Sequence, residues 1–210
     1  HHSYGKTEMW FVLDNEPQAT IINGFKRKTS KEEFAKALQD DTYLQLLNYE
    51  EAQAEDAFYI PAGKLHALNS GLLIVEIQQT SDITYRVSDW GRVDENGNTR
   101  ELHVELALDV IDYSAENNGK VSYKKNKNQP VLLVESPFFK TNLLEFDQDL
   151  TVDYNLIDSF VVYICIKGVA SIVQSSGKST KVRAGETVLI PADLRNFRLI
   201  PEKPCSLIET

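Results

Sequence analysis

An apolar segment that ends at a tight turn and continues with a single histidine places the strongest constraint on how this chain folds. Residues 58–60 (Phe-Tyr-Ile) precede the turn Pro-Ala-Gly at 61–63, and residues 64–68 continue as Lys-Leu-His-Ala-Leu. Since side chains alternate between the two faces of a strand, His66 lies on the opposite face from its two apolar neighbours. The segment predicts a pair of barrel strands, in which His66 is either structural or a metal ligand.

Short apolar segments separated by turns continue along most of the chain and predict a mostly β protein. Strands are expected over residues 9–13, 18–23, 57–60, 65–68, 72–78 and 83–87. A few short helices are also expected. Ser30 and Glu33 form a capping-box pattern at the start of one, residues 42–47 predict a second, and residues 101–113 carry apolar side chains at helical spacing.

A polar run over residues 114–128, rich in Asn and Lys, is the best candidate for a domain boundary. Its lysine cluster is more typical of a solvated linker than of an anion-binding site. Beyond it, residues 129–210 predict short strands separated by turns, as in a second sandwich or barrel. The chain is therefore expected to have two lobes, residues 1–113 and 129–210, joined by this linker.

The second lobe repeats one motif of the first. Residues 186–192 (Glu-Thr-Val-Leu-Ile-Pro-Ala) echo residues 56–62 (Asp-Ala-Phe-Tyr-Ile-Pro-Ala), and at the same offset Asn196 takes the position of His66. No histidine follows His103 in the sequence. The second lobe is therefore expected to lack a metal site and to serve as a structural cap or as the surface of a homodimer.

Lys6 and Glu8 stand two residues apart where the first strand begins, so they share a face of that strand. Glu8 is either a solvated carboxylate at a strand end or a metal ligand. A neutral imidazole and a carboxylate oxygen are ordinary zinc ligands, and a catalytic zinc site also keeps an open position. Glu76 either orients such a site or pairs with a cation.

Four stretches of the chain form a combined pattern. They are Gly-Lys-Thr-Glu-Met-Trp at 5–10, Ile-Pro-Ala-Gly-x-x-His-Ala-Leu at 60–68, Glu-Ile-Gln-Gln-x-Ser-Asp-x-Thr-Tyr-Arg-Val-x-Asp-x-x-Arg at 76–92, and Asn-Thr-Arg-Glu-Leu-His-Val-Glu at 98–105. Together they resemble the type I mannose-6-phosphate isomerases, in particular the short bacterial form. The resemblance runs along nearly the whole chain and implies a cupin-like β-barrel or jelly roll.

The resemblance also implies the residues of the site. Glu8 and His66 would hold a zinc ion, Arg86 would be the active-site arginine, and Lys6 would face the substrate near the metal. Arg92 matches a position where relatives have a basic residue near the sugar phosphate, and a guanidinium can donate two hydrogen bonds to that group. Relatives further carry an N-terminal segment whose Gln-x-His motif supplies two more ligands. No Gln-x-His occurs in this sequence, so we expect a fragment of a longer protein.

Without the resemblance, the two arginines have simpler interpretations. Arg86 would form an ion pair with Asp82 or Asp89, and Arg92 would be a solvated loop residue. With it, the expected reaction is the interconversion of D-mannose 6-phosphate and D-fructose 6-phosphate, by metal-assisted proton transfer through an enediol. The general base stays unassigned, because His, Glu and Lys side chains can all act. The alternatives are a non-catalytic sugar-phosphate-binding or regulatory cupin and, third, another metal cupin such as an oxygenase.

The composition agrees with an enzyme that acts on a small molecule in the cytoplasm. A net charge of −9 is atypical of proteins that bind nucleic acid or anionic membranes through basic surfaces. The sequence has no apolar run of about 20 residues and no leader typical of a signal peptide. Cys165 and Cys205 lie in apolar, strand-like runs, so we expect buried free thiols rather than a disulfide or a zinc pair.

Overall fold

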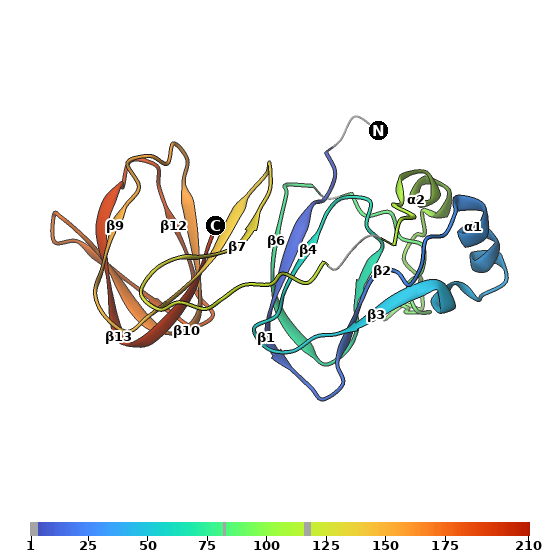
Figure 1. Cartoon of the computed structure of the whole chain (residues 1–210), viewed down its shortest axis with the longest axis horizontal. Helices are drawn as coiled ribbons and strands as arrows, with labels where there is room; N and C mark the ends of the chain where they lie inside the picture. The colour runs from blue at the N-terminus through green and yellow to red at the C-terminus, as the bar shows by residue number, and fades with distance from the viewer. Residues whose placement is uncertain (1–3, 82, 116–118) are drawn as a thin grey trace. The chain divides into compact units, whose positions relative to one another are not determined.

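A computed structural model describes residues 4–81, 83–115 and 119–210 of the chain. Two compact units, His1–Val121 and Ser122–Thr210, each have their own internal packing. Both consist mainly of β-strands, with short helices in the first (Figure 1). The predicted mostly β class is confirmed. In the described residues no helix has the length and apolar character needed to cross a membrane.

The first unit contains two separate three-stranded antiparallel sheets. One has the order β4-β1-β6 and comprises β1 (Glu8–Asn15), β4 (Ala57–Ile60) and β6 (Leu72–Gln78). The other has the order β3-β2-β5 and comprises β2 (Thr20–Phe25), β3 (Leu47–Glu51) and β5 (His66–Leu68). Trp10 and Val12 of β1 pack with Ile21 of β2 in one apolar cluster, which joins the two sheets. The described strands of this unit form these sheets without closing a barrel.

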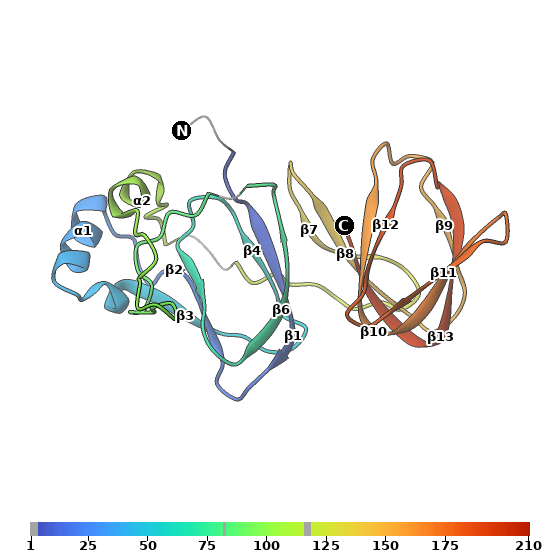
Figure 2. The same ribbon diagram turned by 180° about the vertical axis from the view of Figure 1, so that it is seen from behind.

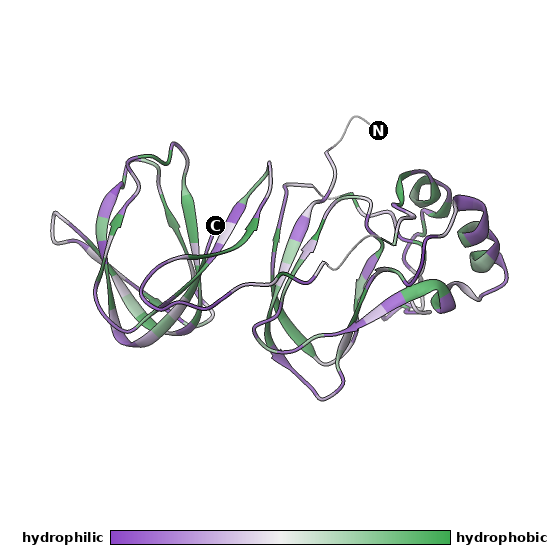
Figure 3. Cartoon of the chain, in the orientation of Figure 1, coloured by the Kyte–Doolittle hydropathy of each residue, from purple (hydrophilic) through white to green (hydrophobic). Residues whose placement is uncertain are grey.

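Helices cover one end of the first unit, as the view from behind shows (Figure 2). They are α1 (Lys31–Gln39), the 3-10 helix η1 (Tyr43–Leu46) and α2 (Val104–Val110). The predicted start of α1 is confirmed, because the backbone N–H of Glu33 donates to Ser30 Oγ at 3.2 Å. Phe34 of α1 and Leu108 of α2 are buried in one cluster with Phe25 of β2. Figure 3 shows α1 as mostly polar and α2 as more apolar.

Two predicted elements differ from the structure around the loop that follows β6. Residues 83–87 are not a strand, and the predicted helix over 101–113 forms only over Val104–Val110. The reason is a local backbone pairing between the two segments, in which the N–H of His103 donates to the carbonyl of Arg86 at 2.7 Å. This bond takes the place of a sheet ladder at Arg86 and keeps residues before Val104 out of the helix.

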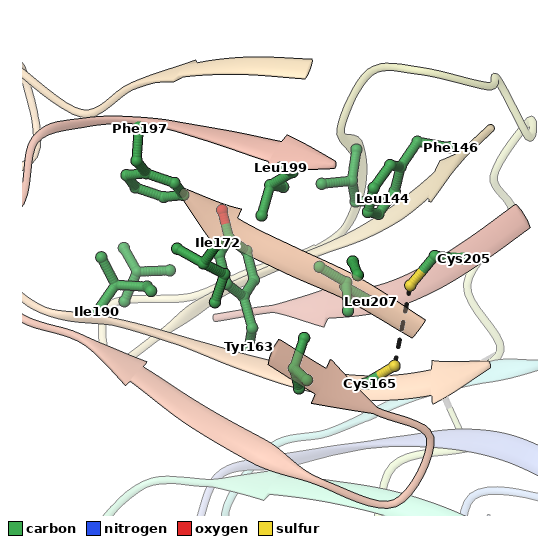
Figure 4. Packing of buried hydrophobic residues seen from close by; sticks show 13 residues of the cluster. Leu144, Phe146, Tyr163, Cys165, Ile172, Ile190, Phe197, Leu199, Cys205 and Leu207 are labelled. Carbon is green, nitrogen blue, oxygen red and sulfur yellow. Dashed lines mark hydrogen bonds between the residues drawn. The ribbon is translucent and has the colours of Figure 1, made fainter. Parts of the chain in front are cut away.

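The second unit is built around two long strands, β10 (Val161–Gln174) and β13 (Asn196–Glu209). Its sheet has the order β11-β10-β13-β8-β7, with β12 paired to β10 and β9 paired to β13. These strands are β7 (Val131–Glu135), β8 (Lys140–Phe146), β9 (Leu150–Asp153), β11 (Ser179–Arg183) and β12 (Thr187–Ile190). Figure 4 shows their inner side chains, including Tyr163, Phe197 and Leu207, in one apolar core.

Gly168 permits a close approach between β10 and β13, and its replacement by alanine is expected to be costly. Its φ is +79°, and a Cβ there would overlap the carbonyl oxygen of Pro204 and lie 3.0 Å from Cys205 Cα. We expect Gly168→Ala to lower the free energy of unfolding by about 3 kcal/mol or more.

Gly177 is the matched control, because its φ of +85° is similar but nothing lies within 4 Å of a Cβ. Gly177→Ala should cost only about 1 kcal/mol. Urea unfolding of both variants measures the difference, and equal losses would contradict this account.

Candidate functional site

Glu8 and His66 are brought together from the two sheets of the first unit. Glu8 is the first residue of β1, where it pairs with Ile60 of β4 and Gln78 of β6. His66 is the first residue of β5 and pairs with Asn23 of β2. Glu8 is 0% exposed, and its Oε1 atom lies 2.9 Å from Nε2 of His66. The two residues that the sequence suggested as metal ligands are therefore in contact.

The imidazole of His66 is held on its other side by the backbone. Its Nδ1 atom lies 2.7 Å from the carbonyl oxygen of Lys64. A carbonyl only accepts, so Nδ1 carries the proton and donates it, and in the neutral ring the lone pair is on Nε2. The indole of Trp10 packs edge-on against the imidazole, with ring centroids 5.5 Å apart and planes at 76°. This arrangement fixes both the tautomer and the orientation that a metal-ligating histidine requires.

The contact between Glu8 and His66 leaves one atom in need of a partner. Although Nε2 is 2.9 Å away, Oε1 of Glu8 receives no well-aligned hydrogen bond from the described residues. A lone pair on Nε2 and a carboxylate oxygen at this distance repel each other unless a proton or a cation lies between them. The donor set fits zinc chemically, as nitrogen and oxygen ligands do. Within the described residues, no group of three or more His, Cys, Asp or Glu side chains is placed to hold a metal ion.

Lys6 connects two carboxylates beside this pair. Its ammonium group forms an ion pair with Oε2 of Glu8 and another, at 2.9 Å, with Oε1 of Glu76. Glu76 lies opposite Trp10 in the ladder of β1 and β6. Burial acts to lower the pKa of Lys6, but both carboxylates raise it, and the net effect is a pKa above its ordinary value. Burial also acts to raise the pKa of Glu8, but the attraction of an imidazole that carries a proton on Nε2, and then of Lys6, lowers it overall. Lys6 is thus held as a cation next to an ionised Glu8.

A cavity of about 490 Å³ lies beside these residues, within the size range of small-molecule sites. Lys6 and His66 lie on its wall, together with three arginines: Arg86, Arg92 and Arg100. The structure therefore places the predicted lysine, histidine and both predicted arginines around one space. A cationic wall of this kind suits an anionic ligand, although the chain as a whole is acidic.

Asp89 organises two of the arginines. Asp89 is buried, and its carboxylate accepts hydrogen bonds from two nitrogens of Arg100, with Arg92 Nε at 3.4 Å. Arg100 chiefly, and the nearby arginines, hold the pKa of Asp89 below its usual value. Arg86 donates from Nη1 to the carbonyl of Glu101 at 3.2 Å. Asp82, the other partner considered for Arg86, lies outside the described residues.

Two residues of this region were not singled out from the sequence. Arg100 could have been found, because it lies in the last of the four motif stretches, but nothing local indicates that it pairs with Asp89. Lys64 is the second: it is 5% exposed, and its Nζ atom has no hydrogen-bond partner among the described residues. Burial lowers the pKa of Lys64. A lysine in a turn is ordinarily solvated, so the sequence carries no signal for this burial.

The second unit has different residues at the corresponding ladder positions. In the first unit Ile60 of the Ile-Pro-Ala turn pairs with Glu8, whereas in the second unit Ile190 of the repeated turn pairs with Val161. Asn196, at the sequence position that corresponds to His66, is exposed and accepts a hydrogen bond from Asn155 at 3.4 Å. The carboxylate and the imidazole of the first unit are thus both replaced.

Comparisons with known proteins test the resemblance to mannose-6-phosphate isomerases and the fold. No known protein-family profile matches the chain. The mannose-6-phosphate isomerase of Streptococcus mutans is 39% identical over 136 residues, and the mannose-6-phosphate isomerase ManA of Bacillus subtilis is 30% identical over 198 residues, or 93% of this chain. The resemblance to mannose-6-phosphate isomerases is confirmed. A crystal structure of the mannose 6-phosphate isomerase from Bacillus subtilis matches 98% of the chain with a TM-score of 0.85 and 28% identity.

The match to these mannose-6-phosphate isomerases covers only part of each relative. The chain spans 43% of the Streptococcus mutans protein, 61% of ManA and 64% of the solved Bacillus subtilis structure. Phosphomannose isomerase from Salmonella typhimurium, at 12% identity and a TM-score of 0.75, shares the fold. Both units of this chain therefore fall within the fold of these isomerases.

Proposed function

We propose that this chain carries the substrate site of a mannose-6-phosphate isomerase, an enzyme that interconverts D-mannose 6-phosphate and D-fructose 6-phosphate. The observation that supports this best is the convergence of Lys6, Glu8 and His66 beside a cavity whose wall carries three arginines. A sugar phosphate needs polar groups at its reacting end and positive charge at its phosphate. The cavity provides both kinds of group within one unit of the chain.

The reaction moves a proton between C1 and C2 of the sugar through an enediol. Negative charge develops on the sugar oxygens during this step, and fixed positive charge close to them lowers the barrier. In the proposal Arg86 provides such charge, with its guanidinium steadied by the carbonyl of Glu101. Lys6 stays protonated between Glu8 and Glu76 and contributes a second fixed charge. Arg92 would bind the phosphate, and the residue that removes the proton is left unassigned.

Zinc is the proposed cofactor, held by Glu8 and His66 with ligands from elsewhere. When bound, zinc polarises an oxygen of the substrate without a proton transfer. The chain's own residues fix the imidazole through the Lys64 carbonyl and keep the Glu8 carboxylate ionised through Lys6. We also propose a cytoplasmic location and a homodimer, in which the second unit is the candidate surface.

The 210-residue chain alone is expected to bind zinc poorly. Glu8 and His66 supply two ligands, whereas catalytic zinc generally has three protein ligands and a water. Dialysis of the zinc-loaded chain against metal-free buffer, followed by metal analysis, should leave much less than one zinc per chain. The control is Glu8→Gln. Because the site is already incomplete, this variant should retain about as little zinc as the unmodified chain. Stoichiometric retention by the unmodified chain would contradict the prediction.

The proposed function is tested in a full-length protein that contains this chain. Isomerisation of mannose 6-phosphate is followed in a coupled assay that detects glucose 6-phosphate formed from the fructose 6-phosphate product. Turnover that depends on added zinc supports the proposal. Binding of mannose 6-phosphate with no turnover in the metal-loaded protein would instead support the alternative, a non-catalytic sugar-phosphate-binding cupin.

A further inference from the structure

Cys165 and Cys205 lie close together in the second unit, and the proposed function assigns neither of them a role. Their Sγ atoms are 3.9 Å apart, and both residues are buried, with 1% and 2% exposure (Figure 4). Cys165 lies on β10 and Cys205 on the neighbouring strand β13. Both thiols are free, as the sequence predicted.

An irregularity in the ladder of β10 and β13 produces this proximity. Cys165 pairs with Leu207 and Lys167 with Ser206, so the register shifts between Cys165 and Lys167. The next irregularity lies at Gly168, whose positive φ lets the backbone of Cys205 approach closely. In a regular ladder the two cysteines would be diagonal neighbours. Here their sulfur atoms are brought into van der Waals contact.

We propose that Cys165 and Cys205 are a modification site that closes to an intramolecular disulfide when the protein meets a small peroxide. The sulfur atoms must approach by about 1.9 Å to reach the bond length of a disulfide, which is within reach of modest side-chain rotation. Both side chains face the same core, so the bond forms without a change of strand pairing. The bond would tie together the two long strands of the unit.

Hydrogen peroxide is the oxidant that converts the two thiols to the disulfide. The thiolate of one cysteine attacks a peroxide oxygen, the O–O bond breaks, and a sulfenic acid and hydroxide form. The second thiol then attacks the sulfenic sulfur, the S–O bond breaks, and water leaves as the disulfide forms. Contact with Cys205 lowers the pKa of the Cys165 thiol, which makes Cys165 the first nucleophile. A peroxide is small enough to reach the pair during brief local opening of the unit.

The test is made on the 210-residue chain itself. After peroxide treatment the chain is denatured and alkylated, its mass is measured by mass spectrometry, and a peptide map locates any disulfide. We expect a mass lower by about 2 Da, no alkylation, and one peptide pair joining Cys165 to Cys205. The melting temperature should rise by roughly 5 °C or more, because the bond closes a loop of about 40 residues (205 minus 165), and dithiothreitol should reverse both changes.

Cys165→Ala and Cys205→Ala are the matched controls, since each keeps one thiol and neither can form the internal bond. The proposal is overturned if both cysteines of the unmodified chain stay alkylatable at a peroxide dose that fully oxidises free cysteine. Oxidation of a single cysteine to sulfinic acid, or a bond between two chains, would overturn it equally. If an alanine variant does not fold, the mass and peptide map of the unmodified chain decide the question.

Discussion

Replacing His66 by alanine in the full-length enzyme is expected to abolish isomerisation. The imidazole is the nitrogen ligand proposed for zinc, its tautomer is fixed by the Lys64 carbonyl, and its Nε2 atom faces the buried Glu8 carboxylate at 2.9 Å. An alanine side chain supplies no lone pair, so the metal would lose a ligand and Oε1 of Glu8 would lose the imidazole 2.9 Å away. Steady-state assays, with zinc content and melting temperature measured on the same preparation, separate loss of metal from loss of fold.

Asn196→Ala is the control for that variant, because Asn196 holds the corresponding position in the second unit. An amide nitrogen has no available lone pair, and Asn196 is exposed, so it has no part in the proposed site. The change should leave turnover and zinc content as they are and cost at most a hydrogen bond of about 1 kcal/mol. If a folded Asn196→Ala enzyme lost activity, the second unit would have a direct role in the chemistry.

Replacing Arg86 by alanine in the full-length enzyme should reduce turnover by roughly a hundredfold or more and leave zinc content unchanged. Arg86 lies on the cavity wall, and its guanidinium donates to the Glu101 carbonyl, so its charge is held in place before the substrate arrives. Removing a preorganised charge of this kind typically costs on the order of 3 kcal/mol of transition-state stabilisation. Steady-state kinetics on the metal-loaded variant measure this cost.

Arg86→Lys tests whether a positive charge alone is enough at this position. Lysine keeps the charge but lacks the planar set of donors, so it should restore activity only in part. Arg183→Ala is a matched control, because this arginine of the second unit is exposed and pairs at the surface with Glu186. A near-normal turnover of Arg86→Ala would show that Arg86 serves in an ion pair rather than in the reaction.

Strands with apolar cores and clear turns were predicted well. Residues 57–60 and 72–78 are strands with the predicted bounds, because turn residues bracket each apolar run. β3 was missed, since three of the five residues in its sequence Leu-Asn-Tyr-Glu-Glu are polar, as suits a strand at the edge of its sheet. Residues 83–87 were wrongly assigned to a strand, because the carbonyl of Arg86 pairs with the N–H of His103 and the segment lines the cavity instead of joining a sheet.

For the candidate site, contacts between residues close in the sequence could be predicted, and contacts that depend on the packing of distant segments could not. The spacing of Lys6 and Glu8 places both side chains on one face, and their ion pair confirms that placement. The contact between Glu8 and His66 depends on how two sheets pack, which no spacing in the sequence encodes. The pairing of Asp89 with Arg100 likewise depends on the path of the intervening loop. The catalytic, phosphate-binding and metal roles of these residues stay predictions.

The two units differ in how their layers are held together, and this difference has a mechanical consequence. In the second unit β10 and β13 are paired from Tyr163 with Glu209 to Gln174 with Phe197, so backbone hydrogen bonds join the two long strands directly. In the first unit the described strands form two sheets with no shared ladder, and Glu8 and His66 project from opposite sheets. The two residues therefore face each other across the gap between the two sheets. An ion bound by both residues would add a cross-link between two sheets that are also joined by the packing of Trp10 and Val12 against Ile21, so its removal is expected to lower the stability of the first unit.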